Sequence, residues 1–450
     1  MFSRTTARRQ FSRLLALLSC AALLSVSSVS FAAAKLSPED LEKKNEGWYP
    51  SGLPLVNASS DAGVGYGVRL YMYDNGTKAD NHFDSTPYFT RLYGQFFQTT
   101  KGQAFHELNL DMPYAFGSEW RLTGNFMYAE VLSANYFGLG ADAADAGLSD
   151  ATATGYDTLL DYESFLDTND ADGNSNRKFN NYQRQRIYTR WTASREVTDW
   201  LEVVGGLELG KVNITDWSGT EFANGEETLM AAQTRFGRDR EELIGADGGW
   251  TNLLVLGVKF DERDFEPNPK SGVMAEYFLE LSGAYVGSSY NYIRQSLAAR
   301  GFYTLFDRLT LAGRLSFTYT TEDAPFYEKS SMTFFEGRRD ALGGIRTARG
   351  YLQERFIANG ISLLQAEMRY TIGDTLIFGQ RFGLQPFAFA DVGNVYDTLG
   401  DMFTKPRLGD AKLSYGGGLV IPWNLSTLIH VFMGYSDEGS SMSINFMHAF

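Results

Sequence analysis

Most of this chain consists of segments of roughly ten residues in which apolar and polar side chains alternate, separated by turns. Between 309 and 320, for example, Leu309, Leu311 and Leu315 alternate with Thr310, Arg314 and other polar or small residues. A period of two places the two sets on opposite faces of a strand. A soluble sandwich also alternates, but it rarely has so many charges on the inner face of its strands. The pattern therefore favours an all-β transmembrane barrel with lipid outside and a polar lumen.

Counting these segments predicts about 16 antiparallel strands, within the even-numbered range of such barrels. The expected strands lie near 52–58, 62–73, 86–98, 103–113, 119–132, 181–194, 199–213, 250–262, 272–285, 288–304, 308–321, 361–372, 382–396, 412–421, 427–436 and 441–449. Short turns at 117–119, 196–198 and 305–307 are expected on the periplasmic side. The long insertions 133–180, 214–249 and 322–360 are expected to be extracellular.

The N-terminus has the features of a secretory signal. Four arginines precede the apolar run 14–18, and small residues at 32–34 offer a cleavage site. We therefore expect a signal peptide at 1–34, a short periplasmic segment at 35–50 and the barrel at 51–450. Cys20, the only cysteine, lies in the signal, so the mature chain would carry no thiol in an oxidising compartment. A lipoprotein anchor at Cys20 is the alternative interpretation.

Composition excludes several classes of protein. Apart from the signal, no apolar run approaches the length of a membrane-spanning helix, which excludes a helical membrane protein. Removing the signal's four arginines leaves 36 basic against 54 acidic residues, a net charge of −18. A surface of this charge makes nucleic acid an unsuitable partner.

The C-terminal residues 442–450 alternate up to a terminal aromatic residue, Phe450. Bacterial outer-membrane barrels characteristically close with such a strand, and their assembly machinery reads it. Together with the signal and the alternation, Phe450 predicts an outer-membrane location.

One arginine in the insertion 322–360 has suitable partners in the predicted strands. Arg349 lies in the sequence Ala348-Arg349-Gly350-Tyr351, while Glu367 and Asp391 lie inside alternating strands on the faces expected to point inward. An ion pair between loop and wall requires the loop to fold back into the lumen. Gly393, two residues after Asp391, would leave room for the loop tip. The alternative is that these are ordinary surface charges.

Several motifs follow one another in the second half of the chain. They are the hairpin residues Asp261, Arg263, Asp264, Pro267, Pro269 and Gly272; the loop 342–351 with Arg349, Gly350 and Tyr351; the strand 367–370; the strand 389–393 with Phe389, Asp391 and Gly393; the segment 415–419; and Phe450. In this order they resemble the motifs of the BamA-type bacterial surface antigen superfamily. Two features depart from the family pattern. Ala348 replaces the usual Val or Ile, and residues 35–50 are too few for the periplasmic POTRA domains of characterised members. A barrel-only member is expected.

The resemblance implies a function in insertion or translocation of proteins or lipids at the outer membrane, with no enzymatic activity and no cofactor. Arg349 would pair with Asp391 and Glu367. The family mechanism uses a weak seam between the first and last strands, and the first strand expected here is short and contains Pro54, which cannot donate to the ladder. A shortened strand without a gating role is equally compatible. A passive pore or structural surface protein that keeps the fold is the second functional hypothesis.

The expected partners are outer-membrane lipid, lipopolysaccharide, the barrel assembly machinery and an unknown client or periplasmic protein. Other chemistry is poorly supported. The four histidines are dispersed, and the calcium-like run 170–174 lacks acids at the first and last loop positions. The insertion 133–180 is acidic, which suits a solvated face or lipopolysaccharide bridged by divalent ions. Ser37 and Pro38 predict a short periplasmic helix at 37–44.

Overall fold

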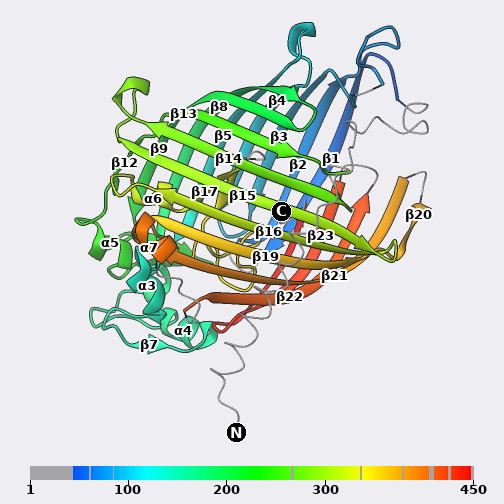
Figure 1. The fold of residues 1–450 in the computed structure, drawn as a ribbon. Coiled ribbons are helices and arrows are strands. Elements are labelled where there is room, and N and C mark those ends of the chain that lie inside the picture. The colour runs from blue at the N-terminus through cyan, green and yellow to red at the C-terminus, as the bar shows by residue number, and fades with distance from the viewer. Residues whose placement is uncertain are drawn as a thin grey trace.

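A computed structural model describes residues 44–446, except 60–61, 85, 265–267, 335–336, 378–379, 405–409 and 424–426. Sixteen antiparallel strands form a closed barrel (Figure 1). They are β1 (Trp48–Ser59), β2 (Gly63–Asp74), β3 (Thr90–Thr99), β4 (Gln103–Met112), β5 (Trp120–Asn135), β8 (Asn181–Thr198), β9 (Leu201–Asp216), β13 (Leu253–Asp261), β14 (Gly272–Ser282), β15 (Tyr292–Leu305), β16 (Leu309–Thr320), β19 (Gly360–Tyr370), β21 (Gln380–Tyr396), β22 (Lys412–Trp423), β23 (Thr427–Tyr435) and β24 (Ser440–Phe446).

Each strand of the ring pairs with the next along the chain, and the ring closes where β1 meets β24. At this closure Ala58 pairs with Ile444 and Ser59 with Ser443. Two short strands, β12 (Gly248–Trp250) and β20 (Gly373–Ile377), extend the sheet at β9 and β21. All sixteen predicted strands are therefore confirmed, each at about the position expected.

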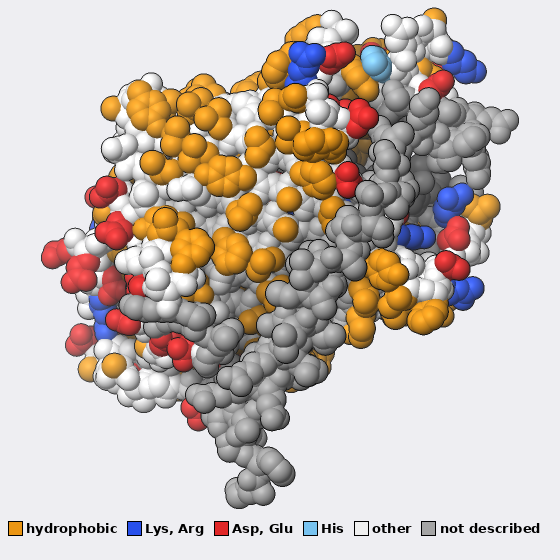
Figure 2. All heavy atoms as spheres, in the orientation of Figure 1, with side chains coloured by type: hydrophobic (Ala, Val, Ile, Leu, Met, Phe, Trp, Pro, Cys, Tyr) orange, Lys and Arg blue, Asp and Glu red, His pale blue; other side chains and the backbone are white. Residues whose placement is uncertain are grey.

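The predicted alternation is visible in the burial of the strands. In β16 the even-numbered residues are buried and the odd-numbered residues are partly exposed, and β14 and β19 alternate in the same way. The buried arginines and carboxylates lie on the inner face, whereas large apolar side chains such as Leu70 and Leu108 are exposed on the outer face. Figure 2 shows apolar side chains spread over the wall, with charged side chains gathered towards the two ends.

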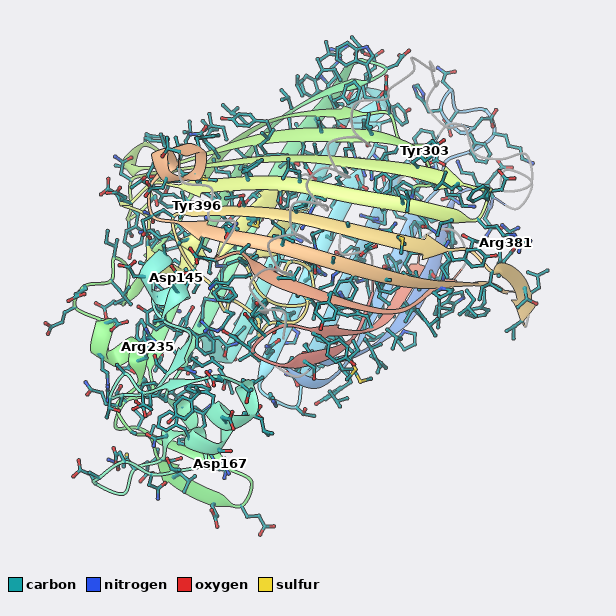
Figure 3. All side chains as sticks on the ribbon, turned by 60° about the horizontal axis from the view of Figure 1, so that its bottom comes forward. Asp145, Asp167, Arg235, Tyr303, Arg381 and Tyr396 are labelled. Atoms are coloured by element: carbon teal, nitrogen blue, oxygen red, sulfur yellow. The ribbon has the colours of Figure 1, made fainter. Side chains whose placement is uncertain are left out.

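The long insertions lie together at one end of the barrel and carry short elements. These are α3 (Ala141–Asp145), β6 (Leu148–Ser149), β7 (Gly155–Tyr156), α4 (Leu159–Leu166), η2 (Asn176–Lys178), β10 (Glu221–Asn224), β11 (Glu227–Met230), α5 (Arg235–Asp239), η3 (Ala284–Val286), α6 (Phe326–Lys329), β17 (Ser331–Phe334), β18 (Gly337–Asp340) and α7 (Leu399–Thr404). The short elements η1 (Ala115–Gly117) and β20 lie at the opposite end. In Figure 3, Asp145, Asp167 and Arg235 mark the end with the long loops, whereas Tyr303 and Arg381 mark the opposite end.

Two details differ from the sequence-based expectations. The first strand is longer than expected because it begins at Trp48 and pairs with β2 over its whole length, including Pro54 opposite Val68. The turn expected at 196–198 is wrong, since β8 continues to Thr198 through an irregularity after Glu196 and the chain turns at 199–200. Among the helices of the described ranges, none is long and apolar enough to cross a membrane. The signal, most of the 37–44 segment, Pro267 and Phe450 lie outside the described residues.

Candidate functional site

The candidate site is centred on Arg349 and is built on two neighbouring strands. β19 and β21 pair antiparallel, with Gln365 opposite Asp391 and Glu367 opposite Phe389. Alternation places all four of these side chains on the buried face of the sheet. Two carboxylates from adjacent strands thus lie side by side on the inner wall, where burial would be costly without a cation.

Arg349 supplies that cation. Its Nε and Nη2 donate to the two oxygens of Asp391 at 2.9 and 2.7 Å, and its backbone N–H donates to Asp391 Oδ2 at 3.1 Å. Its Nη1 donates to Glu367 Oε1. The guanidinium also lies over the Phe389 ring, 3.7 Å from its centroid. Arg349 is 1% exposed, Asp391 0% and Glu367 2%, so the arrangement is a dry, bidentate ion pair with a second carboxylate attached.

Further polar contacts complete the site. Arg369 Nε donates to Glu367 Oε2 at 2.7 Å, so two arginines face two carboxylates. Gln365 Nε2 bridges Asp391 Oδ1 at 3.1 Å and the Thr347 carbonyl at 2.9 Å. Burial alone would lower the pKa of the Arg349 guanidinium, but Asp391 and Glu367 outweigh burial and hold that pKa above its ordinary value. The charged hydrogen bonds of the cluster can therefore hold the loop against the wall.

The residues next to Arg349 fasten the same loop to the last hairpin of the barrel. A Cβ on Gly434 of β23 would lie 2.2 Å from the Arg349 carbonyl oxygen, and a Cβ on Gly350 would lie 2.4 Å from the Tyr435 carbonyl oxygen. The Gly350 carbonyl accepts a bond from Ser436 Oγ at 2.9 Å. The two backbones can approach this closely because both facing positions are glycine.

Two side chains beyond Gly350 reach the same hairpin. The Tyr351 hydroxyl donates to Asp437 at 2.5 Å. Arg355 makes a two-pronged pair with Glu438 at 2.9 and 2.7 Å. Gly393 also accommodates the loop, but the atom closest to a Cβ built there is Leu342 Cδ1, 2.2 Å away. The room that Gly393 leaves is thus used by Leu342, seven residues before Arg349.

A second ionic cluster in the same insertion was not predicted from the sequence. Glu328 of α6 is fully buried and pairs with Arg294 of β15 and, at 2.6 Å, with Arg186 of β8. Glu354 pairs with Arg184 of β8 at 2.8 Å. The inward parity of the three arginines was readable in the sequence, but nothing local indicated which loop acids they meet.

The hairpin motif between β13 and β14 lies at the opposite end of the barrel from the 321–359 insertion. Arg263 Nε and Nη2 donate to Asp261 at 2.8 and 2.7 Å. Asp264 Oδ1 accepts from the backbone N–H groups of Lys270 and Ser271 at 3.0 and 3.2 Å. Gly272 has φ +102°, and a Cβ there would lie 2.1 Å from the Glu262 carbonyl oxygen. These residues shape a turn, and they do not join the Arg349 cluster.

Comparison with known proteins gives two family matches. Residues 29–89 match a domain of unknown function, DUF5982, and residues 97–428 match the Omp85 superfamily domain. No protein with a curated description matches significantly.

Several solved structures resemble this chain at low sequence identity. BamA from Haemophilus ducreyi lacking POTRA domains 1–3 is 14% identical with a TM-score of 0.50, and the match covers 90% of this chain and 70% of that one. CdiB from Escherichia coli is 8% identical with a TM-score of 0.49, covering 88% of this chain and 62% of that one. CdiB from Acinetobacter baumannii is 11% identical with a TM-score of 0.45, covering 89% and 59%.

Proposed function

The chain belongs to the Omp85 superfamily, and we propose that it inserts or translocates proteins, or lipids, at the outer membrane. The observation that carries the proposal is the Arg349 cluster, in which a loop is held to Asp391 and Glu367 on the buried face of β19 and β21. In this proposal the long loops are extracellular, outer-membrane lipid and lipopolysaccharide surround the wall, and the assembly machinery recognises Phe450 during biogenesis.

We infer that the 321–359 insertion folds into the lumen. Its acids pair with inward-facing arginines of β8 and β15, while Arg349 pairs with inward-facing acids of β19 and β21. These strands stand on different sides of the ring, so contacts of one segment with all of them support a path across the interior. A crossing of this kind leaves little room for a wide aqueous channel, which supports client handling over passive diffusion.

The same insertion holds the hairpin that leads into the closing strand. Gly350, Tyr351 and Arg355 contact residues 436–438, which connect β23 to β24. β24 in turn pairs with β1 at Ala58 and Ser59. In the proposed mechanism the client engages the seam between β1 and β24, and the insertion sets the position of the β23–β24 hairpin on one side of that seam. The proposal leaves the client and any periplasmic partner protein unidentified.

A reversible cross-link at the seam tests this function. Ser59 and Ser443 are paired, so Ser59→Cys with Ser443→Cys places two thiols across the closure, and the natural sequence contributes no other thiol after Cys20. The matched control is Ser296→Cys with Thr318→Cys across β15 and β16, where the hydroxyls are 3.1 Å apart. Cells whose only copy is the seam variant should change the protein or lipid content of their outer membrane when oxidised, and reductant should reverse the change.

An unchanged outer membrane in oxidised cells, with the disulfide verified on gels, would argue against client passage at the seam. Planar-bilayer recordings address the pore hypothesis separately. A steady, ion-selective conductance would identify a passive pore, whereas a small and erratic one is expected from a barrel crossed by its own loop.

A further inference from the structure

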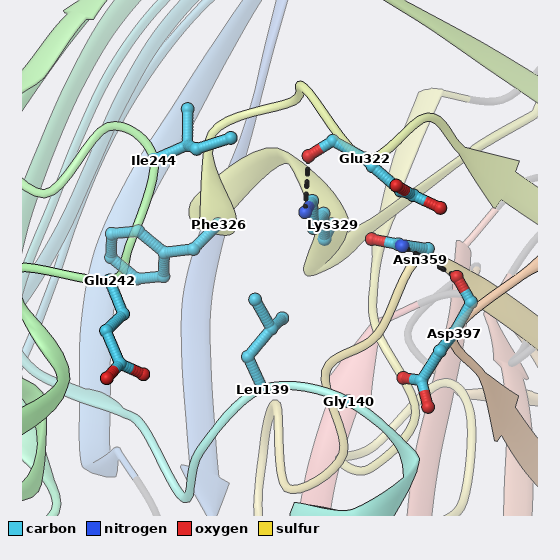
Figure 4. A pocket seen from close by; sticks show the side chains of 9 residues that line it. All are labelled: Leu139, Gly140, Glu242, Ile244, Glu322, Phe326, Lys329, Asn359 and Asp397. Atoms are coloured by element: carbon cyan, nitrogen blue, oxygen red, sulfur yellow. Dashed lines mark hydrogen bonds between the residues drawn. The ribbon is translucent and has the colours of Figure 1, made fainter.

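A cavity of about 320 Å³ opens where four of the long loops meet (Figure 4). Leu139 comes from the segment between β5 and β8, Glu242 and Ile244 from the segment between β9 and β13, and Asp397 from the segment between β21 and β22. The insertion between β16 and β19 supplies the floor through Phe326 and Lys329. The volume is at the lower end of the range for small-molecule sites.

Hydrogen bonds between the four segments hold the walls in place. The Phe326 N–H donates to the Ile244 carbonyl at 3.0 Å, and the Gly140 N–H donates to the Ile357 carbonyl at 2.8 Å. Asn359 Nδ2 donates to the Asp397 carbonyl at 2.7 Å, and Asp397 Oδ1 accepts from the Ala141 N–H at 2.9 Å. The cavity is thus formed before any ligand arrives, which lowers the entropic cost of binding.

The floor of the cavity contains an incompletely paired cation. Lys329 is 6% exposed, and its Nζ donates to the Glu322 carbonyl at 2.9 Å. An ammonium has three N–H donors, and the described residues provide no second acceptor within bonding distance. Burial lowers the pKa of Lys329, although Glu322, Asp323 and Asp397 oppose this shift. An acceptor oxygen entering the cavity would satisfy the remaining donors.

Two exposed carboxylates, Glu242 and Glu322, stand at the rim of the cavity. The Glu322 carboxylate is also close enough to the Lys329 ammonium to oppose the lowering of its pKa. Leu139, Ile244 and Phe326 add apolar side chains to the lining. The lining therefore offers a buried cation, an apolar surface and an anionic rim in one small space.

We propose that this cavity binds a small zwitterion with an apolar portion, such as an α-amino acid with a large apolar side chain. The ligand carboxylate accepts from Lys329, its ammonium faces Glu242 and Glu322, and its side chain packs on Leu139, Ile244 and Phe326. A simple anion would meet the repulsion of the rim acids, and a simple amine would leave Lys329 unsatisfied. No group of acids, histidines or cysteines able to hold a metal ion occurs in the described ranges.

Three probes of similar size distinguish the contribution of the ligand carboxylate from that of the ligand ammonium. L-phenylalanine carries both charges, phenethylamine lacks the carboxylate and 3-phenylpropionate lacks the ammonium. We expect calorimetry on the purified full-length barrel in detergent to show saturable binding of L-phenylalanine, at least about tenfold tighter than either analogue, because each analogue loses a charge-assisted hydrogen bond. No saturable binding of L-phenylalanine up to about 10 mM, or equal binding of all three, would overturn the proposal.

Substitutions then assign the contacts. Glu242→Gln changes an exposed side chain and should weaken L-phenylalanine binding about tenfold while leaving 3-phenylpropionate unaffected. Glu241→Gln, one residue away and outside the cavity lining, is the matched control and should change nothing. Lys329→Met keeps the aliphatic stem and should remove the advantage of L-phenylalanine over phenethylamine. If Glu242→Gln and Glu241→Gln behave alike, or if Lys329→Met leaves the preference intact, the assigned orientation is wrong.

Discussion

Replacing Arg349 by alanine should damage this protein more than any other single arginine change in the long loops. The substitution removes three side-chain donors and leaves two acids with less than 3% exposure, Asp391 without its ionic partner and Glu367 with Arg369 alone. Removing one partner of such a buried pair costs about 3–5 kcal/mol, which is roughly two to four orders of magnitude in the folding equilibrium. The stacking on Phe389 at 3.7 Å is lost at the same time.

The assay compares two properties of the purified barrel. We expect Arg349→Ala to lose heat-modifiable migration on gels at a lower temperature and to be cleaved by protease near residues 340–355. Arg349→Lys keeps the charge but not the two-pronged geometry, so it should fall between the natural protein and the alanine variant. Asp391→Asn should give a defect similar to that of Arg349→Ala.

A double-mutant cycle tests whether Arg349 and Asp391 interact. Arg349 and Asp391 share one interaction, so the double change should cost less than the sum of the single changes, with a coupling of about 2–3 kcal/mol in urea titrations. Additivity within about 0.5 kcal/mol would show that the two residues do not interact in solution, and the loop would then have no anchor at this wall.

Three other substitutions test separate contacts. Gly434→Ala should lower the free energy of unfolding by about 1–3 kcal/mol in the same urea titration, because its Cβ would lie 2.2 Å from the Arg349 carbonyl oxygen. Gly205→Ala, with open space at its Cβ, should be nearly neutral, and equal effects of the two changes would refute the close backbone approach. Glu328→Gln should lower the gel-transition temperature far more than Glu119→Gln, whose surface pair with Arg195 contributes about 0–1 kcal/mol; a similar shift in both would contradict the buried cluster. Asp264→Ala should cost about 1–2 kcal/mol without opening the 340–355 region to protease, and cleavage there would show that the two ends of the barrel are coupled.

The strands were predictable because each one repeats a local signal. Alternation with a period of two has a direct structural cause, and lipid outside with a polar lumen inside makes that alternation strong. Parity also places Glu367 and Asp391 on the inner face of their strands, whereas the choice of Arg349 as their partner drew on the resemblance to the family motif. The turn at 196–198 was misplaced because Glu196 and Thr198 look like turn residues, although β8 runs through them.

The remaining contacts of the insertion were out of reach for a different reason. The approach of Gly350 to Gly434 and the pairing of Glu328 with Arg186 and Arg294 join positions far apart in the chain. An irregular loop has no period, so the positions at which it contacts the wall follow from the three-dimensional shape of that wall. In the sequence, Gly434 looks like any other glycine in a strand. Its role is visible only in the structure, where the backbone of Arg349 lies against it.

The insertion contacts two parts of the barrel, the strands β19 and β21 and the β23–β24 hairpin. Its contacts with the two parts differ in strength, and this difference sets which of them separates from the insertion first. At β19 and β21 the Arg349 pairs are dry, with both acids and the guanidinium at 0–1% side-chain exposure. At the last hairpin, Glu438 is 16% exposed in its pair with Arg355, and Asp437, which accepts from Tyr351, is exposed. Water can therefore replace the contacts at the last hairpin more easily than the Arg349 pairs at β19 and β21. Any outward movement of the β23–β24 hairpin would therefore break its contacts with residues 350–355 first, while Arg349 stays anchored on the opposite side of the loop.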